Sequence, residues 1–134
     1  MAVEKIDSSR AKALLADDAV YLDVRTIPEF EAGHAPGAYN LPLMHAAPGG
    51  MQPNPRFAEV VGKTFARDRP LVVACKAGGR SARACAVLEQ LGFTRVFDFA
   101  GGWAGNATDP GWPKSGGETT TAHEPGHAWD DLER

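Results

Sequence analysis

Short apolar runs alternate with helical patterns along the 134-residue chain. Runs rich in apolar, β-branched and aromatic residues predict strands at 19–24, near 39–41, at 71–74 and at 94–99. Helices are predicted at 8–16, from Thr26 to Gly33, at 55–66 and at 81–91, whereas three prolines and two glycines make 44–55 a loop. Strands that alternate with helices indicate right-handed crossovers. We therefore predict an α/β fold with a parallel sheet and helices on both faces.

The length and composition of the chain favour one domain. An apolar fraction of 43% and a charged fraction of 23% are typical of soluble globular proteins. The sequence contains neither a run of 18 apolar residues nor an apolar signal core at its start, so we expect a cytoplasmic protein without a membrane partner. Residues 114–134 are polar and lack periodicity, which predicts a mobile tail after a domain formed by residues 1–113.

Charge is unevenly distributed along the chain. The net charge of −3 argues against a nucleic-acid partner. Between residues 63 and 83, however, the chain has one acidic residue, Asp68, and six basic ones: Lys63, Arg67, Arg69, Lys76, Arg80 and Arg83. Such a basic region can attract a small anion. For the first three of these cations, solvation at the surface is the simpler interpretation.

Cys75 is the candidate nucleophile. It follows the unbroken apolar run of residues 71–74, which is typical of a strand buried on both faces, and ligands of α/β sheets bind where such strands end. The next six residues, Lys76, Ala77, Gly78, Gly79, Arg80 and Ser81, lead through two glycines into the predicted helix. Inward-turned amides and a helix N-terminus favour a bound anion and the thiolate form of cysteine. Cys85, inside that helix, is interpreted as core packing, with a resolving cysteine as the alternative.

Three blocks of sequence resemble the rhodanese family of sulfurtransferases. CKAGGRS at 75–81 is similar to the family's active-site loop, YLDVRTIPEFEAGHAPGAYNLP at 21–42 to its N-terminal signature, and FDFAGGWAG at 97–105 to the turn before its last helix. The blocks occur in the family's order within about residues 5–113. The resemblance implies a single-domain sulfurtransferase with an open, mainly parallel five-stranded sheet. It also implies that Asp23 and Arg25 support the active-site loop, whereas His34 is expected to hydrogen-bond the turn around it.

The resemblance further implies a reaction in two steps. Cys75 attacks the outer sulfur of an anionic donor such as thiosulfate, and residues 76–81 hold the donor and the resulting persulfide. A thiophilic acceptor then removes the sulfur; cyanide, a small thiol or a cysteine of a partner protein are the candidates. No cofactor and no metal are expected. His123 and His127 have a spacing that metal ligands can adopt, but Pro125 and Gly126 interrupt the helix that would align them.

Several alternatives stay open at this point. Phosphatases and arsenate reductases of related form use a Cys-x5-Arg loop, one residue longer than the Cys75-x4-Arg80 spacing here. A module that carries sulfur or binds a partner protein without turning over small molecules is the second alternative. Arg80 itself is expected to hold the donor's negative charge, with a structural ion pair as the other interpretation.

Overall fold

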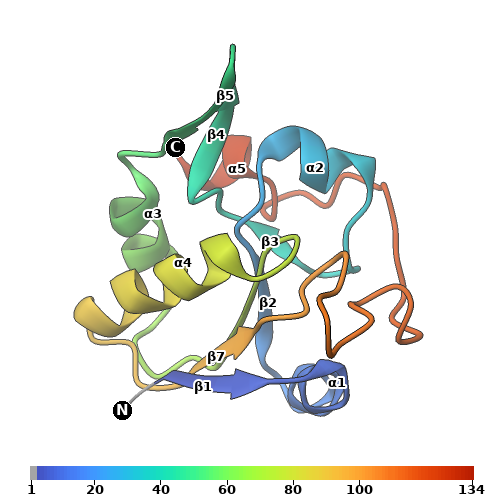
Figure 1. The fold of residues 1–134 in the computed structure, drawn as a ribbon. Coiled ribbons are helices and arrows are strands. Elements are labelled where there is room, and N and C mark those ends of the chain that lie inside the picture. Colours follow the sequence, from blue (N-terminus) through green and yellow to red (C-terminus); the bar gives the residue numbers. More distant parts are fainter. Residues whose placement is uncertain (1–2) are drawn as a thin grey trace.

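Five parallel strands form the central sheet in a computed structural model that describes residues 3–134 (Figure 1). Their spatial order is β1-β7-β6-β2-β3, with every neighbouring pair parallel. The strands are β1 (Val3–Ile6), β2 (Val20–Asp23), β3 (Tyr39–Asn40), β6 (Leu71–Ala74) and β7 (Val96–Phe99). This arrangement confirms the predicted α/β class and places β6, the strand before Cys75, at the centre of the sheet.

Helices cover both faces of the sheet. They are α1 (Ser8–Ala16), α2 (Ile27–Ala32), α3 (Phe57–Thr64) and α4 (Gly79–Gln90). Side chains of β6 alternate between the faces: Leu71 and Val73 pack in one core with α3 and α4, and Val72 packs in the other with α1. Burial on both faces explains the continuous apolar run of this strand. None of the helices in residues 3–134 has the length and apolar character that a membrane crossing needs.

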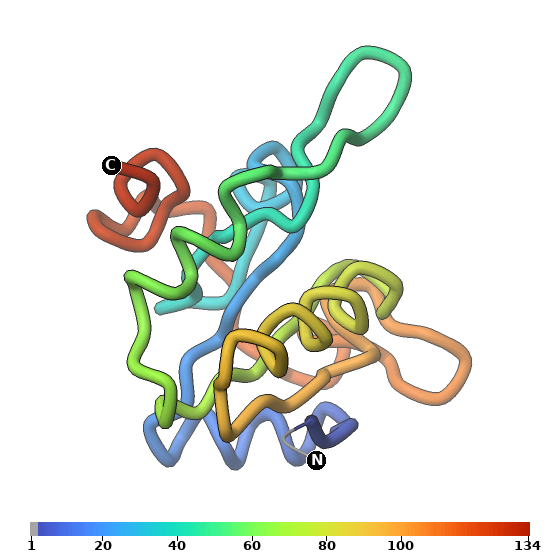
Figure 2. The backbone as a smooth tube through the Cα atoms, turned by 90° about the vertical axis from the view of Figure 1, so that its left-hand side faces the viewer, coloured from blue at the N-terminus to red at the C-terminus, as the bar shows by residue number. Residues whose placement is uncertain are grey.

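The segment predicted as a loop after β3 is a hairpin, so that prediction was wrong in part. β4 (Met44–Ala47) and β5 (Gly50–Pro53) pair antiparallel and project from the body of the molecule (Figure 2). The turn between them is Pro48-Gly49, and Gly49 has a φ of +82°, a conformation that favours glycine. The hairpin is largely exposed and therefore lacks the apolar alternation that marks a strand in the sequence. Strand β1 was missed because it is short and half-exposed at the sheet edge.

The C-terminal residues differ from the expected mobile tail. We call residues 118–134 the C-terminal strap, because they return across the edge of the sheet beside β3 and end in α5 (Trp129–Leu132). Trp129 is 4% exposed and belongs to the core on the α3 and α4 side. The strap is held by backbone hydrogen bonds, by Trp129 and by polar side chains such as Glu124. None of these contacts produces a periodic pattern in the sequence, so the sequence did not predict them.

Candidate active site

Cys75 lies at the carboxyl end of β6, under the loop that leads into α4. Its sulfur accepts a hydrogen bond from the Gly78 amide at 3.1 Å. The residue is 2% exposed, whereas Lys76, Ala77 and Gly79 above it are open to solvent. The structure therefore places Cys75 at the carboxyl end of β6, as predicted, and shows that it is buried among core residues beneath the exposed loop.

Backbone conformation at Gly78 sets the shape of this loop. Gly78 is the N-cap of α4 and has a φ of +113°, in the left-handed region. A side chain there would bring its Cβ to 2.9 Å from the Ala100 carbonyl oxygen, so only glycine fits. The amides of the first helical turn, Gly79, Arg80 and Ser81, have no intrahelical acceptors. The loop thus combines a buried sulfur with backbone donors at a helix N-terminus, which is suited to an anion.

A second loop, residues 100–104, is hydrogen-bonded to the backbone of the active-site loop. The Trp103 amide donates to the Cys75 carbonyl oxygen, and the Ala104 amide to that of Lys76, each at 2.9 Å. Gly102 makes this approach possible, because a Cβ at that position would lie 2.3 Å from the Cys75 carbonyl oxygen. The sequence marked the Gly101-Gly102 turn but gave no indication of which backbone it holds.

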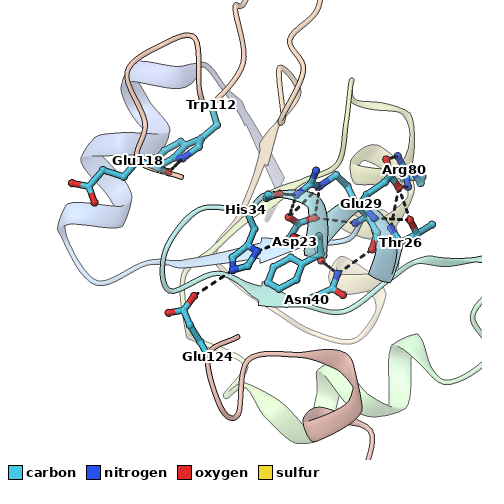
Figure 3. A network of polar contacts seen from close by, with 12 residues as sticks. Asp23, Thr26, Glu29, His34, Asn40, Arg80, Trp112, Glu118 and Glu124 are labelled. Carbon is cyan, nitrogen blue, oxygen red and sulfur yellow. Dashed lines mark hydrogen bonds and ion pairs between the residues drawn. The ribbon is translucent and has the colours of Figure 1, made fainter. Parts of the chain in front are cut away.

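Arg80 forms the structural ion pair that we considered as an alternative. Its two terminal nitrogens lie 2.7 and 3.1 Å from the carboxylate oxygens of Glu29, on α2 (Figure 3). Glu29 also accepts hydrogen bonds from Thr26, the N-cap of α2. Burial acts to raise the pKa of Glu29, but the bonds from Arg80 and Thr26 outweigh it and lower that pKa to about 2. The capping-box spacing of Thr26 and Glu29 was recognised in the sequence, whereas the partner of Glu29 was not.

Asp23 and Arg25 form a buried ion pair at the end of β2, where Asp23 is paired with Ala74 of β6. Arg25 Nη2 lies 2.7 Å from Asp23 Oδ2, and their side chains are 4% and 1% exposed. The same nitrogen donates to the Gly33 carbonyl oxygen at 2.7 Å, and the guanidinium lies 4.7 Å from the centre of the Trp103 ring. Asn40 closes the group by donating to the backbone oxygens of Asp23 and Arg25. These contacts tie β2, β3 and the loop of residues 100–104 together around the site.

His34 holds the turn after α2. Its Nδ1 lies 2.8 Å from the Phe30 carbonyl oxygen, and its ring stacks on that of Phe30 with centroids 3.8 Å apart. The residue is 2% exposed. These contacts are those of a residue that organises backbone, as expected from the sequence.

Most of the basic side chains between residues 63 and 83 contact other parts of the folded chain. Arg67 donates to the backbone oxygens of Gly62 and Leu91, Arg69 lies 3.6 Å from Asp18, and Lys63 donates to the C-terminal residue. Lys76 and Arg83 are exposed and, within residues 3–134, have no acidic partner. They are the cations that remain available to an anion near the loop.

Cys85 and His127 contribute to packing, whereas His123 does not. Cys85 is 2% exposed among the core residues of α4, and burial raises the pKa of its thiol, so it stays protonated. Both cysteines are free thiols. His127 stacks on Tyr39 at 3.9 Å, whereas His123 is exposed. Within the described part of the chain, no three His, Cys, Asp or Glu side chains are grouped as metal ligands are.

Ser81 anchors the start of α4 to the sheet through a buried acid. Its hydroxyl donates to Asp98 Oδ1 on β7 at 2.8 Å, and Asp98 is 3% exposed. Burial raises the pKa of Asp98, although the bond from Ser81 opposes the shift. The folded protein therefore binds this proton more tightly than the unfolded chain. As pH rises from 3.8 through the raised pKa, Asp98 lowers the free energy of unfolding.

We predict that Asp98→Asn removes this loss of stability. The amide oxygen still accepts from Ser81, and no charge is buried, so the free energy of unfolding near neutral pH should rise by about 1 kcal/mol or less. Urea unfolding across pH would measure it, with the exposed Asp68→Asn as control. A variant less stable than the wild type near neutral pH would show that the charged form of Asp98 is needed.

The structure defines an α/β domain with a cysteine-containing loop at the end of its central parallel strand, and comparison with known proteins identifies the family. The Rhodanese-like domain family matches residues 7–108, and the chain belongs to that family. Thiosulfate sulfurtransferase 16, chloroplastic, of Arabidopsis thaliana is 44% identical over 96 residues, covering 72% of this chain and 75% of the relative.

A second relative and a solved structure agree. Protein HIGH ARSENIC CONTENT 1, mitochondrial, of Arabidopsis thaliana is 40% identical over 102 residues, covering 76% of this chain and 60% of that relative. A solution NMR structure of the rhodanese-like domain of the Alr3790 protein from Anabaena sp matches with a TM-score of 0.69 at 21% identity, covering 88% of this chain and 79% of that one. The structural match supports the fold that the sequence resemblance implied.

Proposed function

We propose that this protein is a sulfurtransferase that moves a sulfane sulfur through a persulfide on Cys75. The donor is thiosulfate or a small persulfide, and the acceptor is cyanide or a thiol. The observation that carries the proposal is the hydrogen bond from the Gly78 amide to the Cys75 sulfur inside a loop that ends at a helix N-terminus. A donor aimed at this sulfur can stabilise the negative charge that the sulfur carries as the attacking and the leaving group of the two steps.

The reaction proceeds by two displacements. In the first, the Cys75 thiolate attacks the outer sulfur of thiosulfate, the S–S bond of the donor breaks, and sulfite leaves with the bonding electron pair. Cys75 then carries a persulfide, whose outer sulfur lies among the amides of residues 76–81. In the second, the acceptor attacks that outer sulfur and the thiolate of Cys75 departs. Cyanide becomes thiocyanate and a thiolate acceptor becomes a persulfide, so no external oxidant or reductant is needed.

The residues around the sulfur have separate roles in this proposal. Lys76, which follows Cys75 in the chain, and Arg83, in α4, are both exposed and can attract the anionic donor. Arg80 instead fixes the loop, because both terminal nitrogens of its guanidinium are hydrogen-bonded to Glu29. Ser81 secures the start of α4 through Asp98. The SO3 group of thiosulfate is therefore expected to interact with backbone amides and Lys76 rather than with Arg80.

Two alternatives are separated by substrate tests. Phosphatase or arsenate reductase chemistry needs a ring that encloses a tetrahedral oxyanion, and a loop with four residues between Cys75 and Arg80 is one residue shorter than the loops that do so. A carrier module would accept sulfur from a protein donor and not from thiosulfate. Arsenate and p-nitrophenyl phosphate test the first alternative, and persulfidated proteins test the second.

Steady-state kinetics with thiosulfate and cyanide test the proposal. Two displacements through one covalent intermediate predict ping-pong kinetics, with parallel lines in double-reciprocal plots as the fixed substrate is varied. Turnover of thiosulfate should exceed that of arsenate or p-nitrophenyl phosphate. Intersecting lines, or a preference for either oxyanion substrate, would refute the proposed reaction.

A further inference from the structure

The C-terminal strap pairs with backbone on both sides of the turn before β3. The His34 amide donates to the Thr120 carbonyl oxygen at 2.9 Å, and the Thr120 amide donates back at 2.8 Å. Farther along, the Asn40 amide donates to the His127 carbonyl oxygen at 2.8 Å. β3 is the last strand of the sheet, so the strap covers its open edge. The strap lies entirely beyond residues 7–108, the part that matches the family.

Glu124 is the charged side chain of the strap that contacts the turn before β3, at Gly37 and His34. Its two carboxylate oxygens lie 3.1 and 3.0 Å from the Gly37 amide. One of them also lies 3.6 Å from His34 Nε2, a buried nitrogen that has no hydrogen-bond partner among the described residues (Figure 3). Buried polar atoms without partners are uncommon. The position of Glu124 therefore indicates an electrostatic contact with His34, which becomes an ion pair when Nε2 carries a proton.

His34 connects this contact to α2. Its other ring nitrogen bonds the Phe30 carbonyl oxygen, and its ring lies against the Phe30 ring. The neighbouring residue, Glu29, holds Arg80 of the active-site loop. α2 has six residues, too few to hold a helix by its own hydrogen bonds, so its position depends on contacts at its ends. One continuous set of contacts thus runs from Glu124 through His34, Phe30 and Glu29 to Arg80.

We propose that the strap positions the active-site loop, with Glu124 and His34 as positioning residues that act through α2 and Glu29. With Glu124 in place, α2 is held at both ends and presents the Glu29 carboxylate to Arg80. Without it, the strap loosens at Gly37 and His34, α2 becomes more mobile, and the loop above Cys75 loses its fixed geometry. The proposal rests on the proposed function only for its kinetic consequence, because loop order can be measured without turnover.

Amide hydrogen exchange at Gly78 measures loop order directly. Gly78 donates to the Cys75 sulfur, so its protection reports how often that bond opens. We expect Glu124→Ala to lower the protection of the Gly78 and Asn40 amides by about three- to tenfold. Glu124→Gln should keep it near the wild-type value, because its amide can accept from Gly37 and donate to His34 Nε2. Glu118→Ala is the matched control, since the Glu118 side chain makes no hydrogen bond or ion pair among residues 3–134.

A double-mutant cycle separates positioning from general stability. We expect Glu124→Ala to reduce kcat/KM for thiosulfate by about three- to tenfold, mainly through kcat, and to have no further effect in a Glu29→Gln background. Independent effects that multiply would overturn the proposal, as would unchanged Gly78 protection in Glu124→Ala. If the wild type transferred no sulfur from any donor, the proposed function would fail, whereas a selective loss of Gly78 protection would still establish the positioning role.

Discussion

Replacing Cys75 with serine is expected to reduce sulfur transfer from thiosulfate to cyanide by at least about a thousandfold. A serine hydroxyl is not ionised near neutral pH and cannot form a persulfide, so both displacements lose their nucleophile or leaving group. The substitution changes one atom in a residue that is 2% exposed and packed in the core. The fold should therefore persist, and the loss should appear in kcat rather than in the amount of folded protein.

Cys85→Ser provides the matched control for this experiment. Cys85 is buried to the same extent, ten residues along the chain in α4. If it only packs, its replacement should cost some stability and leave sulfur transfer within about threefold of the wild type. Comparable loss in both variants would mean that both cysteines take part, as a nucleophile and a resolving thiol would. Retained transfer in Cys75→Ser would eliminate Cys75 as the nucleophile.

Gly102→Ala is expected to lower the free energy of unfolding by about 3 kcal/mol and to impair transfer severely. Gly102 has a φ of +54°, and its added Cβ would lie 2.3 Å from the Cys75 carbonyl oxygen and 3.0 Å from that of Lys76. Both contacts are with backbone, which cannot move aside as a flexible side chain can. The substitution would therefore push the loop of residues 100–104 away from the active-site loop. Urea unfolding and thiosulfate kinetics measure the two effects.

Gly49→Ala distinguishes steric displacement from backbone strain. Gly49, in the exposed hairpin turn, also has a positive φ, +82°, but a Cβ there would meet no atom within 4 Å. Its replacement should cost about 1 kcal/mol and leave transfer nearly unchanged. Equal effects of the two substitutions would show that the close approach at Gly102 does not matter for the site.

The sequence predicts most of the central fold because burial leaves a pattern. The apolar run before Cys75 identified the central strand, and the change to helix-forming residues after Ser81 identified α4. Elements at the periphery left no such pattern. β1 is half-exposed, the β4–β5 hairpin is largely solvated, and the strap is held mainly by backbone bonds. These elements depend on contacts between distant residues, which periodicity does not report.

The same limit applies to the candidate site. Cys75 and its loop were predictable because the nucleophile, the glycines and the helix start are contiguous in the chain. The partner of Arg80 is 51 residues away, and the partner of Ser81 is 17 residues away on another strand. Long side chains such as Arg80 can reach a ligand or a nearby acid equally well, so residue type alone left both interpretations open. In the folded chain Glu29 lies within hydrogen-bond distance of Arg80, and the ion pair forms.

Mass spectrometry of the intact protein after incubation with thiosulfate detects a persulfide on Cys75 directly. We predict that the wild type gains the mass of one sulfur atom, that peptide mapping places it on Cys75, and that cyanide removes it to yield thiocyanate. Cys75→Ser should gain none, and Cys85→Ser should behave as the wild type does. A sulfur atom found on Cys85, or no gain in mass from thiosulfate while a persulfidated protein does load Cys75, would contradict this prediction.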